Sequence, residues 1–77
     1  MREFSLDRLE TGQDAVIVGV GGVGVFRRRL LELGLLPGTP IARTGQAPLG
    51  DPLSFRVRDS VLCLRRAEAA DIGVRGK

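Results

Sequence analysis

Four closely spaced glycines are the first feature of this sequence that points to chemistry. Gly19, Gly21 and Gly24 fit the pattern G-x-G-x-x-G, which follows a predicted strand and opens a predicted helix. In dinucleotide-binding proteins this arrangement places a pyrophosphate against the free N–H groups of a helix N-terminus. A nucleotide- or anion-binding module that uses Gly19 to Gly24 is therefore one hypothesis for function.

Three properties of the following segments argue against that hypothesis. About 20 residues further on, where an acidic residue would bind the ribose, the chain has no acid, and Arg43 would fit only a 2′-phosphate. The segment after the helix opens with Pro37 and Pro40, which disfavour a central parallel strand there. The 77 residues are also too few for several βαβ units of about 30 residues each. The simpler prediction is that the glycines form a flexible connection.

Three consecutive arginines, Arg27, Arg28 and Arg29, follow the glycines at the start of the predicted helix. Positive charge at a helix N-terminus opposes the helix dipole, so helix stability does not explain them. One interpretation is a solvated face whose long side chains cover apolar neighbours. The other interpretation is a contact patch for an acidic partner.

The chain is poor in side chains that catalyse reactions or bind metals. It has no histidine and a single cysteine, Cys63, so a tetrahedral zinc site or an internal disulfide is not expected. We predict no catalytic, cofactor-binding or metal-binding residue, and we predict that the protein is not an enzyme. An unpaired cysteine fits a reducing compartment, and neither a secretory signal nor a membrane span is evident. We therefore expect a cytoplasmic protein without direct membrane insertion.

One helix, over residues 25–33, is predicted with an apolar stripe formed by Phe26, Leu30 and Leu33. Gly34 is expected to end it in a Schellman motif, with Leu35 against Leu30. Residues 36–39 then read as a type II turn, because proline and glycine occupy its central positions.

Short strands are predicted on either side of this helix, at residues 15–20, 39–44, 53–58, 61–65 and 72–74. Residues 59–60 form a tight turn, and single helical turns are expected at 5–9, capped by Ser5, and at 67–71. About five strands and one helix in this length predict a mainly β fold. It is a small, partly open SH3-like barrel with the helix inserted after the first strand, in a single domain spanning 1–77. The predicted core consists of Leu30 and Leu33 from the helix, with Ile17, Ile41, Phe55, Leu62 and Leu64.

The loop at residues 47–52 is a second candidate binding feature. It contains two prolines and a glycine, and Leu49 is predicted at its tip. Loops carry binding functions more often than the scaffold beneath them, so Pro48, Leu49 and Gly50 join the three arginines as candidate partner-binding residues. The alternative is that Leu49 folds back and caps one end of the barrel.

The charge of the chain gives a weaker signal. The net charge of +3 comes from 11 arginines and one lysine, which is compatible with an anionic partner. Acidic and basic residues alternate, and three phenylalanines without tyrosine or tryptophan offer little for base stacking. We expect no nucleic acid partner, although a small basic nucleic-acid-binding barrel stays among the alternatives.

Three blocks of sequence together resemble a known family. They are RRRLLELGLLPGT at 27–39, APLGDP at 47–52, and LRRAEA at 64–69 followed by Ile72 and Val74. This combination resembles the FeoA family, small cytosolic accessory proteins of bacterial ferrous iron uptake, over roughly residues 5–74. The resemblance implies an SH3-like barrel. This chain departs from the family at Asp59, where the family usually has glycine. Because aspartate also tolerates turn conformations, the expected fold is unchanged.

The resemblance also implies a partner, FeoB, the membrane transporter of ferrous iron with a cytosolic GTP-binding domain. We therefore predict an accessory protein that binds that domain or another cytosolic face of the transporter. A related SH3-like domain ends metal-dependent regulators of the diphtheria-toxin-repressor type, so a regulatory domain is a further alternative. This chain has no helix-turn-helix segment to accompany such a domain.

Overall fold

The computed structural model describes residues 2–22 and 24–76, with only the backbone of Phe26. Val23 of the glycine-rich stretch, and the side chain of Phe26 in the predicted apolar stripe, lie outside the described part. The elements, in chain order, are β1 (Glu3–Ser5), the 3-10 turn η1 (Leu6–Arg8), β2 (Asp14–Val20), α1 (Gly24–Glu32), β3 (Pro40–Gln46), β4 (Leu53–Val57), β5 (Ser60–Leu64), α2 (Arg66–Ala69) and β6 (Ile72–Gly76).

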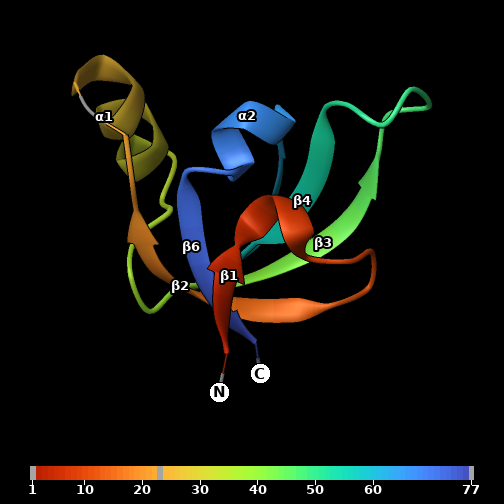
Figure 1. Cartoon of the computed structure of the whole chain (residues 1–77), viewed down its shortest axis with the longest axis horizontal. Coiled ribbons are helices and arrows are strands. Elements are labelled where there is room, and N and C mark those ends of the chain that lie inside the picture. Colours follow the sequence, from red (N-terminus) through yellow and green to blue (C-terminus); the bar gives the residue numbers. More distant parts are fainter. Residues whose placement is uncertain (1, 23, 77) are drawn as a thin grey trace.

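The strands form a single sheet in the order β1-β6-β2-β3-β4-β5, and each neighbouring pair is antiparallel. The register shifts between Ile17 and Gly19 in β2, and between Arg43 and Gly45 in β3. Such bulges bend a strand and increase its twist, and the sheet is strongly curved in Figure 1. The predicted mainly β architecture is confirmed.

The described chain has six strands, where about five were predicted, because β1 was missed. β1 has three residues and is held by pairing with β6, with Phe4 opposite Val74. A three-residue segment carries too little periodicity to be recognised, and its partner lies at the other end of the chain. α1 consequently follows the second strand instead of the first. Ser5 ends β1, and its side chain makes no capping hydrogen bond to η1.

The core lies inside the curved sheet. Six of the seven residues predicted for it lie inside it or against it: Leu30, Ile17, Ile41, Phe55 and Leu64 are buried, and Leu62 is half-buried against them. The remaining buried apolar residues are Leu6, Leu9, Ala15, Leu35, Leu53, Val57, Ala69, Ile72 and Val74.

The prediction for Leu33 was wrong, because its side chain is 45% exposed. α1 ends at Glu32, and the chain reverses at Gly34, whose φ is 93°. The Leu35 N–H donates to the Leu30 carbonyl at 3.3 Å, and the Gly34 N–H donates to the Leu31 carbonyl at 3.0 Å. These two bonds are the predicted Schellman motif. The reversal brings Leu35 into the core beside Leu30, so Leu33 is left outside.

The predicted type II turn at residues 36–39 is also present. The Thr39 N–H donates to the Leu36 carbonyl at 3.1 Å, and φ of Gly38 is 89°. The Gly38 N–H then donates to the Ile17 carbonyl at 2.7 Å, which ties the turn to β2. The later tight turn is shifted by one residue from its predicted place. It consists of Arg58, with φ of 58°, and Asp59.

Figure 1 shows α1, α2 and the β3–β4 connection at one end of the molecule, and both ends of the chain at the opposite end. In the described part of the chain, no helix is long and apolar enough to cross a membrane.

Candidate partner-binding site

The two predicted binding features, the arginines of α1 and the loop 47–52, lie at the same end of the sheet with α2 between them (Figure 1). We call the exposed residues of α1, α2 and the loop 47–52 the helix–loop surface. Interactions between side chains and backbone connect its three parts, and they show how two segments far apart in the sequence share one surface.

The arginines of α1 are all exposed, but they differ in their contacts. The Arg27 Nε donates to the Val20 carbonyl at 3.2 Å, which fastens the start of α1 to the end of β2. Arg29 Nη1 donates to Glu68 Oε2 of α2 at 2.7 Å, in an ion pair. Within the described chain, Arg28 makes no hydrogen bond or ion pair. The guanidinium of Arg28 is therefore the one of the three that is free to meet a partner.

α2 holds the loop 47–52 from the other side. The Arg66 Nε donates to the Gly50 carbonyl at 2.7 Å, and the Arg66 N–H donates to Asp51 Oδ1 at 2.9 Å. Glu68 Oε1 accepts the Arg65 N–H at 2.8 Å, which caps the start of α2. Neither Arg66 nor Glu68 was predicted as a site residue. The only signal was the acid three residues after Arg65, a spacing typical of capping.

The loop itself is closed by its own backbone. The Ala47 N–H donates to the Pro52 carbonyl at 2.9 Å, and the Gly50 N–H donates to the Ala47 carbonyl at 2.8 Å. Gly50 has φ of 87°, a value that favours glycine. Pro48 is exposed, and the side chain of Leu49 is 97% exposed. The alternative that Leu49 folds back onto the barrel is therefore wrong.

Further apolar side chains are exposed on and just beyond α1. Val25 is 79% exposed in its first turn, and Leu33 and Leu36 are 45% and 43% exposed after its last. A helix packed on its sheet normally buries an apolar stripe, whereas Leu30 is the only side chain of α1 described as fully buried. The helix–loop surface thus combines free positive charge with exposed apolar groups.

The glycine-rich stretch connects β2 to α1, which agrees with the prediction that it is a connection between a strand and a helix. The Gly21 N–H donates to the Asp71 carbonyl at 2.6 Å, and a side chain at this position would approach the same carbonyl oxygen to 3.0 Å. β2 is antiparallel to both of its neighbours, β3 and β6. The dinucleotide hypothesis requires a parallel βαβ unit, and the described strands contain none.

Arg43 does not face a nucleotide site either. Its side chain points inward and is 8% exposed. Nη1 donates to the Leu9 carbonyl at 2.7 Å, and Nη2 donates to the Gln46 side chain. The guanidinium thus pairs with buried backbone and with its own strand, and it has a structural role.

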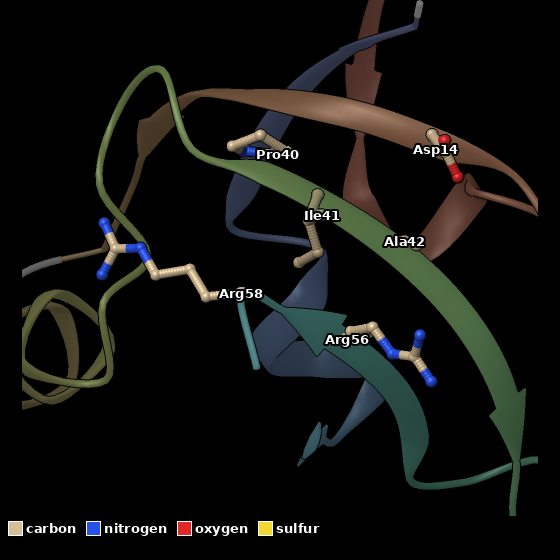
Figure 2. A pocket seen from close by; sticks show the side chains of 6 residues that line it. All are labelled: Asp14, Pro40, Ile41, Ala42, Arg56 and Arg58. Carbon is tan, nitrogen blue, oxygen red and sulfur yellow. The ribbon is translucent and has the colours of Figure 1, made fainter. Parts of the chain in front are cut away.

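A separate groove of about 260 Å³ lies on β2, β3 and β4 and shares no residue with the helix–loop surface. Figure 2 shows its lining residues: Asp14, Pro40, Ile41, Ala42, Arg56 and Arg58. The side chains of Arg56, on β4, and Arg58, in the turn that follows it, extend in different directions (Figure 2), and neither makes a hydrogen bond within the described chain. The groove is lined mainly by apolar atoms.

Metal ligands do not gather in the described part of the chain, where no group of three Cys, Asp or Glu side chains is close enough to hold an ion. Cys63 is exposed on β5.

Comparison with known proteins places this geometry in a family. The model of the FeoA domain matches residues 4–76. A fusion protein of Porphyromonas gingivalis, which joins Fe(2+) transport protein A to the Fe(2+) transporter FeoB, is 49% identical over 69 residues. That match covers 90% of this chain, and this chain spans 8% of the fusion protein.

Solved structures agree with the fold. The NMR structure of an FeoA-like protein from Clostridium acetobutylicum superposes with a TM-score of 0.89 at 33% identity, covering 99% of this chain and 88% of that chain. Stenotrophomonas maltophilia FeoA, crystallised with zinc and described as a prokaryotic SH3 domain protein, gives a TM-score of 0.82 at 29% identity, over 92% of this chain and 88% of that one. The SH3-like prediction is thereby confirmed. The family model matches residues 4–76, and the fusion protein is 49% identical over 90% of this chain. This chain therefore belongs to the FeoA domain family.

Proposed function

We propose that this chain is an accessory protein of ferrous iron uptake that acts in the cytoplasm by binding the FeoB transporter through the helix–loop surface. The observation that supports the partner is the Porphyromonas gingivalis fusion, in which a segment 49% identical to this chain is part of the same polypeptide as FeoB. Fusion gives two domains a high effective concentration toward each other, which is useful where they act together.

The contacts of α2 support the choice of surface. α2 is bonded to α1 through Arg29 and Glu68, and to the loop 47–52 through Arg66 and Gly50. A partner that touches both α1 and the loop therefore meets a backbone already held in place, and little loop entropy is lost on binding.

The charges and apolar groups of this surface have different tasks in the proposal. Arg28 attracts an acidic face of the transporter's cytosolic GTP-binding domain and raises the association rate. Leu49, at the tip of a closed loop, enters an apolar depression of the partner and sets the lifetime of the complex. The protein contributes binding and positioning, and no chemical step is assigned to its residues.

The test is a binding measurement between the full chain and the purified cytosolic domain of FeoB from the same organism, with and without guanine nucleotide. We expect specific binding that weakens when Arg28→Glu reverses the free charge. The loss should lie in the association rate and shrink above about 0.3 M salt, because the Debye length falls with ionic strength.

The matched control is Arg75→Glu, an exposed charge reversal on β6. Figure 1 shows the C-terminal end of the chain, which follows β6, at the end of the molecule opposite the helix–loop surface. This reversal produces the same change in net charge as Arg28→Glu. Because it lies away from the proposed surface, it should leave binding nearly unchanged. Equal effects of the two reversals would reject the surface, and the absence of any binding under either nucleotide condition would reject the partner.

A further inference from the structure

β5 is an edge strand whose second side is unpaired in the described part of the chain. It stands last in the strand order and pairs only with β4. Natural edge strands are usually protected by charges, prolines, bulges or very short length. β1, at the other edge, has three residues and carries Glu3. β5 has five residues, no proline, no charged side chain and no shift of register.

The hairpin geometry identifies which backbone groups of β5 face outward. Val57 and Ser60 close the hairpin with two residues between them, so they form a hydrogen-bonded pair. Hydrogen-bonded and non-bonded pairs alternate along an antiparallel ladder, so Leu62 also bonds to β4. The N–H and C=O groups of Val61 and Cys63 therefore point away from the sheet. In the described chain they accept or donate no hydrogen bond to any other segment.

The free part of the edge has a defined end. The Arg65 N–H is bonded to Glu68 Oε1, and the Arg65 carbonyl accepts the N–H groups of Glu68 and Ala69. The open groups are thus those of Val61 and Cys63 alone, and their side chains are exposed, with Val61 at 62%.

Opposite charges flank this free segment. Asp59 precedes β5 and Arg65 follows it, and both are exposed. Arg65 has the same parity in the sequence as Val61 and Cys63, so these three side chains lie on one face of the extended segment, and Asp59 lies in the turn just before β5. If two copies meet antiparallel about a two-fold axis at Leu62, Val61 of one copy faces Cys63 of the other, and the turn that carries Asp59 comes next to Arg65 of the other copy. A parallel arrangement would bring Asp59 against Asp59.

We propose that β5 pairs with β5 of a second copy of this chain, antiparallel and centred on Leu62, so that the two sheets join across a two-fold axis. In this register every outward group of Val61 and Cys63 finds a partner in the other copy, and the flanking charges are complementary on both sides. Because the interface uses neither α1 nor the loop 47–52, the inference is independent of the proposed binding to FeoB.

The first test is oxidative cross-linking of the full chain carrying Val61→Cys, with Cys63 retained. Directly opposite residues lie about 5.5 Å apart between Cα atoms, within the range of a disulfide. We expect a disulfide-linked dimer, with Cys63 joined to the new cysteine of the other copy, which peptide mass spectrometry identifies.

Two single-thiol proteins are the matched controls: the unmodified chain, and Val61→Cys combined with Cys63→Ser. In the proposed register their thiols meet only diagonally, at roughly 8–9 Å between Cα atoms, beyond the limit of about 7 Å for a disulfide. They should cross-link at least about tenfold more slowly. Faster linkage through Cys63 alone would overturn the register.

The second test is sedimentation of the reduced protein over a range of concentrations. The unmodified chain should associate, and Val61→Pro should remain monomeric, since proline removes an outward N–H without removing a β4–β5 hydrogen bond. Val61→Thr keeps the N–H and is the control for the side chain.

A charge exchange tests the same pairing without disturbing the backbone. Arg65→Glu should weaken association, and adding Asp59→Arg should restore it, because the exchanged pair is again complementary. The proposal would be refuted if the unmodified chain stayed monomeric at the highest concentration. It would also be refuted if the double variant associated no more strongly than Arg65→Glu alone.

Discussion

Arg43 is the residue whose role changed most between sequence and structure. Inward and outward positions alternate along β3, and Arg43 lies two residues after the buried Ile41. Its side chain therefore points inward and is buried. A buried arginine requires partners for its donors, and the Leu9 carbonyl, the Gly45 carbonyl and the Gln46 side chain accept its hydrogen bonds. The guanidinium thus holds the segment before β2 against β3.

Replacing Arg43 by alanine is expected to destabilise the fold. The Leu9 carbonyl would lose a bond of 2.7 Å in a buried position, and a buried unsatisfied polar group costs ~1–3 kcal/mol. In a domain of this size that corresponds to a fall in melting temperature of roughly 5 °C or more. Thermal unfolding measures it. Arg43→Lys, which keeps the charge but not the planar fork, should recover only part of the loss, and an unchanged melting temperature in Arg43→Ala would contradict this role.

Leu49 is expected to act in binding and not in stability. Its side chain is 97% exposed, and substitution of an exposed residue usually changes stability by no more than about 0.5 kcal/mol. Leu49→Ala should therefore melt as the unmodified protein does, but dissociate faster from the cytosolic domain of FeoB. Measuring both quantities on one variant separates the roles. A lower melting temperature with an unchanged dissociation rate would show that the residue is structural.

Among the elements, α1 has an unusual balance, because among its described side chains one leucine is fully buried and Val25 is exposed, and exposed Leu33 follows its last residue. Leu30 is buried, whereas Leu33, three residues later, is 45% exposed. The two leucines form a natural pair for comparison. Leu30→Ala should cost ~2–5 kcal/mol, as for other core leucines. Leu33→Ala should cost less than about 1 kcal/mol. Chemical denaturation of both variants checks the difference, and similar costs would mean that α1 packs through another face.

α2 is short, but it connects the two other parts of the helix–loop surface, because Glu68 is bonded to α1 and Arg66 is bonded to the loop 47–52. One oxygen of Glu68 pairs with Arg29, and the other caps the Arg65 N–H. Glu68→Gln retains an oxygen for the cap and loses the ion pair, which for a partly exposed pair is worth about 0–1 kcal/mol. Glu68→Ala loses the cap as well, which adds about 0.5–2 kcal/mol. Unfolding experiments should therefore find Glu68→Ala clearly less stable than Glu68→Gln. Equal stabilities of the two variants would show that the cap contributes nothing.

For the whole molecule, the antiparallel sheet decides against the nucleotide hypothesis raised by the glycines. β2 runs antiparallel to β3 and β6, and Arg43 is occupied inside the barrel. We expect that NAD, NADP, GTP and ATP do not raise the melting temperature. A ligand present at 100 times its dissociation constant would add ~2.7 kcal/mol of stability, a shift of roughly 10 °C in a small domain. Such a shift with any of the four would restore the hypothesis.

The sequence by itself determined the features that depend on a few neighbouring residues. The Schellman ending at Gly34, the turn at residues 36–39 and the alternating strand β4 all follow from backbone preferences and side-chain periodicity within about ten residues. The conjunction of three sequence blocks was also sufficient to indicate the family, which the match over residues 4–76 confirms.

Only the tertiary structure decided the features that depend on distant segments. β1 exists because β6 pairs with it, Arg43 is buried because Leu9 supplies an acceptor, and Leu35 takes the place expected for Leu33. The helix–loop surface depends on Arg29 meeting Glu68, 39 residues away, and on Arg66 meeting Gly50. Local propensity carries no information about which distant groups a folded sheet brings into contact, because pairing and register depend on the packing of the whole chain.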